Sequence, residues 1–143
     1  MAVDIVKSTK EVTASPEIVI TNQDTLFPVA NQFSGDIYAR TIFMPKGAVV
    51  VGKKHLKRHF NFIMTGKAML WMNGVLSYVE APCLLESLEG VRKVLYIEED
   101  MHWTTVHSTD TYDIEEIEAK VVATQSIEEV IEELNKYNIR IGE

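Results

Sequence analysis

The chain has 143 residues, a formal net charge of −7, 46% hydrophobic residues and 24% charged residues, which suits one globular domain with its own core. The single cysteine, Cys83, excludes an intramolecular disulfide, and no apolar run approaches the ~18 residues of a membrane-spanning helix. The N-terminus has no apolar signal region, so we expect a cytoplasmic protein without a membrane partner.

Charge is distributed unevenly along the chain. Residues 43–93 hold eight Lys or Arg against three Glu, whereas residues 98–143 hold three Lys or Arg against thirteen acidic residues. A uniformly basic surface is therefore not expected, and neither is binding to duplex nucleic acid. A local basic pocket for a small anion remains compatible with this pattern.

Residues 1–35 are interpreted as an N-terminal arm and connection. They contain one short apolar run at residues 17–20, and turn-forming residues dominate from there to Gly35.

Residues 36–108 predict a β-barrel core. About eight short runs, rich in β-branched and aromatic residues, alternate with turn formers, which is typical of an all-β sandwich or small barrel. Asn73-Gly74 is the strongest hairpin signal. Breaks between strands are also expected at residues 65–67 and 98–100.

Residues 109–143 predict a C-terminal helical segment. One helix should start near Asp110 or Asp113, and a second should start after Ser126, which forms a capping-box pattern with Glu129. Apolar residues recur at helical spacing from Ile127 onward. We expect one or two amphipathic helices that pack on the barrel or on a second subunit.

The segment 52–61 carries the strongest chemical signal. If it is extended, His55, Lys57, His59 and Asn61 share one face, because side chains alternate along a strand. Imidazoles suit a single divalent transition metal, and His107, on a late strand, is the best candidate for the third ligand that such a site needs. Alternatively, the histidines are hydrogen-bonded pocket residues without a metal.

Lysines beside these histidines suggest a second kind of site. Lys57 and Lys93, with Lys53 and Arg58 nearby, would suit a small anionic ligand such as a phosphate or a carboxylate. Asn61 would then bind the ligand or orient His59. Alternatively, these charges protect exposed sheet edges from aggregation.

The strand pattern around this segment resembles the cupin superfamily, which implies a jelly-roll barrel. His55 occupies the second His position of the first cupin motif and His59 its Glu position, between the flanking Gly47 and Gly66. Lysines occupy two of the four metal-binding positions, and an ammonium is a poor metal ligand. These are Lys53 in the first motif and Lys93 in the second.

Several segments are also similar to small cupin-fold proteins of tailed bacteriophages, among them residues 36–40, 51–55, 59–62 and 103–110. This resemblance implies a viral source, and small cupins that pair through sheet edges form homodimers or higher oligomers. The favoured hypothesis is a non-enzymatic module, either a virion or assembly component or a host-interaction protein. The alternative is a metal-dependent or anion-binding cupin that uses His55 and His59, with His107 as a third ligand.

Overall fold

The computed structural model describes residues 10–11, 18–20, 27–123 and 126–141. The elements in this part of the chain are β1 (Lys10–Glu11), β2 (Ile18–Ile20), β3 (Val29–Ser34), β4 (Ile37–Met44), β5 (Val49–Val51), β6 (His59–Met72), β7 (Val75–Glu80), β8 (Cys83–Ser87), β9 (Lys93–Ser108), α1 (Ile114–Val121), α2 (Ile127–Lys136) and β10 (Ile139–Ile141).

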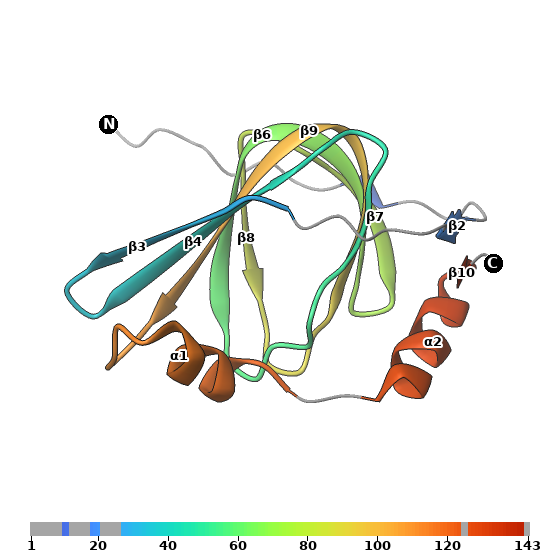
Figure 1. Cartoon of the computed structure of the whole chain (residues 1–143). Helices are drawn as coiled ribbons and strands as arrows, with labels where there is room; N and C mark the ends of the chain where they lie inside the picture. Colours follow the sequence, from blue (N-terminus) through green and yellow to red (C-terminus); the bar gives the residue numbers. More distant parts are fainter. Residues whose placement is uncertain (1–9, 12–17, 21–26, 124–125, 142–143) are drawn as a thin grey trace.

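Eight strands form one antiparallel sheet, which the two longest strands fold into a jelly-roll barrel. Its order is β1-β7-β6-β9-β4-β3, with β5 added to β9 and β8 added to β6. β6 pairs with β8 through its first half and with β7 through its second half, while β9 runs beside it. Figure 1 shows β6 and β9 bending over the closed end of the barrel, with both helices at the other end.

The breaks predicted at residues 65–67 and 98–100 are wrong, because both segments lie inside continuous strands. β6 absorbs its bend through register shifts between Ile63 and Ala68 rather than through a turn. Gly66 lies in this irregular stretch with a φ of 98°, a conformation that L side chains rarely adopt. The hairpin predicted at Asn73-Gly74 is confirmed, with positive φ at both residues.

The reading of the residues before Gly35 as a connection is also wrong for β3. This strand pairs with β4 through all six residues, and the hairpin extends away from the barrel (Figure 1). All six residues of β3 are exposed. Because neither face of the strand is buried, its sequence does not alternate between apolar and polar side chains. Among the described strands, β3 pairs only with β4. The homo-oligomer expected from pairing of sheet edges stays a prediction.

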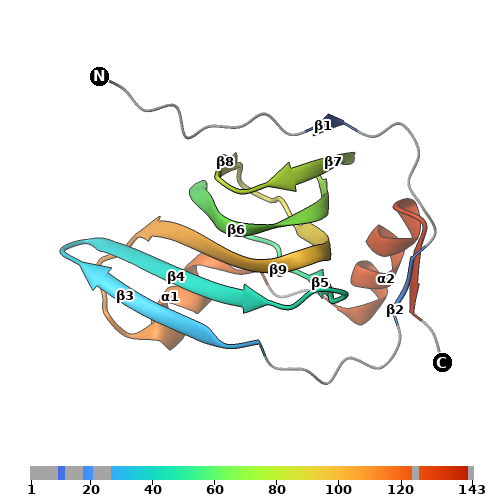
Figure 2. The same ribbon diagram turned by 90° about the horizontal axis from the view of Figure 1, so that it is seen from above.

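Both predicted helices are confirmed, and both pack on the barrel. Asp113 caps α1 through the N–H groups of residues 115 and 116, and the Ser126 hydroxyl caps α2. Ile117 and Val121 of α1 pack against Tyr38 of β4, and Leu134 of α2 packs into a second apolar cluster with Trp71. Figure 2 shows the parallel β2–β10 pair beside α2.

The main apolar core lies between the walls of the barrel. Its largest fully buried members come from β4, β6 and β9, and Cys83 is also buried in it. Within the described residues, no helix is long and apolar enough to cross a membrane.

We predict that Gly66→Ala destabilises the fold by roughly 3 kcal/mol or more. A Cβ atom at this position would lie 2.5 Å from the carbonyl oxygen of Asp100 and 2.7 Å from Cα of Met101, so backbone would have to move. Gly35→Ala is the matched control, because its φ is also positive but nothing lies within 4 Å. It should cost only about 1 kcal/mol. Equal shifts of the two urea unfolding midpoints would contradict this reading of the bend.

Candidate metal and ligand site

The segment that carries His55 is a loop rather than a strand. β6 begins only at His59, so the prediction that His55, Lys57 and His59 share one face of a strand is wrong. Hydrogen bonds hold the loop between two other elements: the His55 N–H donates to the Val91 carbonyl at 3.2 Å, and the Leu56 N–H donates to the Val121 carbonyl at 2.7 Å. The backbone N–H groups of the loop therefore have hydrogen-bond partners although the loop is not part of a continuous strand.

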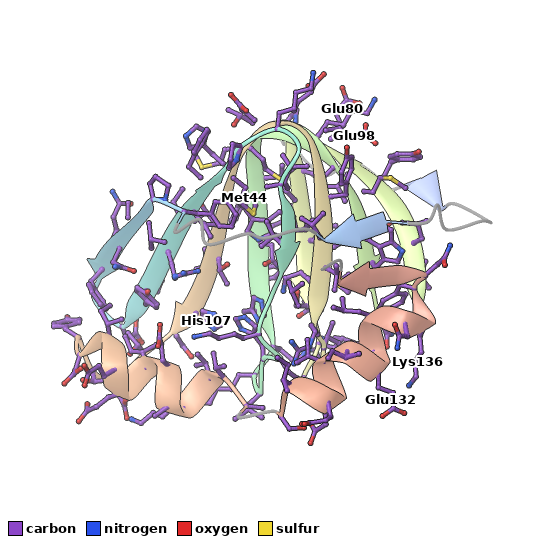
Figure 3. The ribbon with its side chains drawn as sticks, turned by 45° about the vertical axis from the view of Figure 1, so that its right-hand side comes forward. Met44, Glu80, Glu98, His107, Glu132 and Lys136 are labelled. Carbon is purple, nitrogen blue, oxygen red and sulfur yellow. The ribbon has the colours of Figure 1, made fainter. Side chains whose placement is uncertain are left out.

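Three histidines nevertheless meet inside the barrel. One candidate ligand atom from each of His55, His59 and His107 lies within 4.8 Å of the other two. The ring centroids are 4.4 Å apart for His55 and His59, and 4.5 Å apart for His59 and His107. His107 lies in the interior at the barrel end that faces the helices, whereas Glu80 and Glu98 lie at the opposite rim (Figure 3). The predicted trio is therefore brought together, although by a different local structure.

Hydrogen bonds fix the orientation of His59. Its Nδ1 lies 3.0 Å from the Lys57 carbonyl oxygen, which can only accept, so the ring proton of neutral His59 belongs on Nδ1. Nε2 then carries the lone pair and faces the ammonium of Lys93 at 3.2 Å. The Nδ1 atom of His55 is buried and has no hydrogen-bond partner among the described residues. An unpartnered buried nitrogen is costly, which favours an external partner at this position.

Lys93 continues a buried polar chain behind the histidines. Its Nζ donates to the Ser87 hydroxyl at 2.9 Å, and that oxygen also accepts from the Asn61 amide at 2.9 Å. The Asn61 carbonyl oxygen accepts from the Trp103 indole at 2.9 Å. Asn61 is fully buried with both ends of its amide occupied, so it supports the site from behind rather than facing a ligand.

Burial keeps the imidazoles uncharged. It lowers the pKa of His55 to about 3, with the charge of Lys93 as the next cause, and it lowers the pKa values of His59 and His107 to about 4. Burial also lowers the pKa of Lys93 to about 8. At neutral pH the three rings therefore hold lone pairs, which is the form that binds a metal.

The predicted basic residues separate into two groups. Lys93 points into the barrel, but the side chain of Lys57 is exposed. Arg58 is also on the surface, where its guanidinium pairs with Glu86 at 2.8 Å. Only Lys93 of these three therefore contributes to the interior, because residues 57 and 58 belong to the outer part of the loop.

A cavity of about 720 Å³ adjoins the histidines, within the range of small-molecule sites. His55, His107 and Lys93 line it, and so does Arg40 of β4, which sequence reasoning missed as a site residue. Its position in the strand could have indicated this role, because Arg40 shares its strand face with Tyr38 and Met44, which are buried. No comparable sequence pattern indicates that Ser87 is a hydrogen-bond partner of Lys93.

No family model matches the sequence, and neither does any curated protein. Solved structures do match the fold. An RmlC-like cupin family protein from Methanocaldococcus jannaschii, with a double-stranded β-helix fold, is 11% identical with a TM-score of 0.50, over 62% of this chain and 85% of that one. The Cnp3 cupin domain of Schizosaccharomyces pombe is 17% identical with a TM-score of 0.50, over 66% and 75% of the two chains.

The DMSP lyase DddQ of Ruegeria pomeroyi is 17% identical with a TM-score of 0.52, over 61% of this chain and 49% of that one. At such identities the likeness shows the fold alone, and the chain has the cupin fold, as predicted. Because one fold hosts many functions, it does not choose an activity. A viral source is not tested by these matches and stays a prediction.

We predict that the metal-free protein loses stability as the pH falls from about 6.5 toward 5. The unfolded chain protonates its histidines near pH 6.5, whereas the folded triad stays neutral until about pH 4. Unfolding therefore takes up protons in this window, and lowering the pH favours it. Urea unfolding midpoints from pH 7.5 to 5 measure the slope.

The variant His55→Gln/His59→Gln/His107→Gln should show a much flatter profile. His102→Gln is the matched control, because this exposed histidine lies outside the triad, and it should keep the wild-type slope. A flat wild-type profile, or an unchanged slope in the triple variant, would show that the buried histidines do not carry this dependence.

Proposed function

We propose that this chain is a metal-dependent, small-molecule-binding cupin, in which His55, His59 and His107 hold one divalent transition metal at the inner end of the cavity. The observation that carries the proposal is the convergence of three imidazole nitrogens within 4.8 Å of one another. Three protein ligands with room for a further one are the pattern of reactive rather than structural metal sites.

The donor set fits a metal in three respects. All three rings are neutral at pH 7, imidazole is a good ligand for zinc, iron, nickel and copper, and the His55 Nδ1 atom has no protein partner among the described residues. The Lys57 carbonyl fixes the His59 ring with Nε2 toward the site, as an outer partner does for a metal-bound histidine. A bound metal would supply Lewis-acid chemistry to a ligand in the cavity.

Lys93 sets the charge balance of this site. Its amine hydrogen-bonds to the same His59 nitrogen that would bind the metal, so an ammonium there repels a cation. Ser87 gives the amine a second partner, which lets it remain hydrogen-bonded when His59 is occupied. The residue therefore weakens metal binding and favours an anion close to the histidines.

The hypothesis of a virion, assembly or host-interaction module remains a prediction from the sequence. Nothing in the geometry of the barrel supports it over a binding function. The open cavity and the neutral triad favour the small-molecule alternative instead.

We expect about one transition metal per chain in untagged protein that is purified without chelator and supplied with zinc, iron, manganese or nickel. His55→Ala, His59→Ala and His107→Ala should each lower the affinity by about a hundredfold or more, because each removes a ligand. Inductively coupled plasma mass spectrometry and competition with a chromogenic chelator measure the content and the affinity.

Lys93→Met tests the opposite effect, since it keeps a long unbranched side chain and removes the positive charge. It should bind metal about tenfold more tightly than the wild type or better. Circular dichroism must show that every variant is folded. Metal-free wild-type protein under all loading conditions, or equal affinities in the wild type and the histidine variants, would refute the proposal.

A further inference from the structure

The cavity beside the triad has mostly apolar walls. They come from β4, β5 and β9 on the barrel side and from α1 and α2 on the other side, and include Leu95, Trp103 and Val121. Such walls reject a ligand that is charged throughout and favour one with a hydrocarbon body. The apolar part of a ligand would therefore lie between the barrel and its helices.

The charged side chains of the cavity are predominantly basic. Among the described residues that line it, Arg40, Lys53 and Lys93 are cations, and Glu118 is the one carboxylate. Lys53 and Glu118 are exposed at the outside, whereas Arg40 is half-buried. A buried or half-buried cation in apolar surroundings is stabilised by an anion.

Arg40 is a half-buried cation without a protein counter-ion among the described residues. Lys93 already donates to Ser87 and faces His59, but no described residue forms an ion pair or a side-chain hydrogen bond with Arg40. Arg40 lies opposite Thr105 of β9, two residues before His107, and it lines the same cavity as His55 and His107. The guanidinium therefore lies close to the histidines with its donors available to a ligand.

We propose that the cavity binds a small monocarboxylate with an apolar body, whose carboxylate is held by the Arg40 guanidinium beside His55 and His107. The proposal rests on the proposed function in so far as it names the ligand class of that same site. A guanidinium binds a carboxylate through two parallel hydrogen bonds. A phosphate monoester would bring a second charge into the apolar surroundings of the cavity.

Isothermal titration calorimetry with four simple compounds tests the assignment on the full chain, both metal-free and zinc-loaded. Octanoate should bind about tenfold more tightly than octan-1-ol or better, because the alcohol has the same body without the charge. Acetate, which has the charge without the body, should not bind measurably. Octyl phosphate should bind more weakly than octanoate.

Arg40→Met should remove the preference for octanoate over octan-1-ol while leaving the affinity for octan-1-ol unchanged. Retained binding of the alcohol shows that the cavity is intact in this variant. Arg40→Lys should keep part of the preference. Arg58→Met is the matched control, because that arginine is on the surface and paired with Glu86, and it should behave as the wild type.

Equal binding of acid and alcohol by the wild type would overturn the inference, as would a preference that survives in Arg40→Met. Tighter binding of octyl phosphate than of octanoate would replace the carboxylate with a phosphate and also overturn it. Metal content, measured on the same samples, separates the two proposals. An octanoate preference without metal leaves this inference standing and removes the metal, whereas metal without a preference does the reverse.

Discussion

The hydrogen bond between the Lys93 amine and the Nε2 atom of His59 sets the charge balance in the interior of the site. It places a positive charge 3.2 Å from the His59 nitrogen that we propose as a metal ligand, in the interior of an apolar barrel. Burial makes this arrangement stable only if every polar atom finds a partner. The chain from Trp103 through Asn61 and Ser87 provides partners for the amine, and the Lys57 carbonyl accepts from the other ring nitrogen of His59.

The position of the triad also depends on the helices. The loop that carries His55 hydrogen-bonds to Val121, the last residue of α1, and to Val91 just before β9. Ile117 and Val121 bury their side chains against Tyr38, so the end of α1 cannot move without moving the loop. The end of α1 therefore holds the loop of one histidine in place, and both helices form one wall of the cavity.

The sequence predicted the site better than it predicted the local structure. The three predicted histidines do lie together, because the strand order brings His59 and His107 into one barrel interior, but the predicted strand through His55 is wrong. That they bind a metal stays a proposal. The loop depends on contacts with α1, which no local pattern reports. β6 and β9 were each divided in two because Gly66 and the acidic residues near Glu98 look like turns, whereas a long antiparallel pair bends through both. The role of Arg40 could not be predicted from the sequence, since only the fold shows that its strand face borders the cavity.

The most direct test of the central claim is a long-range nitrogen–proton correlation spectrum of protein labelled with ¹⁵N-histidine, before and after zinc is added. We expect His59 to carry its ring proton on Nδ1 at pH 7, and we expect zinc to shift the resonances of the ring nitrogens of His55, His59 and His107. His102, whose ring lies outside the barrel and contacts Thr65, should not change. A His59 ring protonated on Nε2, or a zinc response confined to His102, would show that the three buried histidines do not form this site.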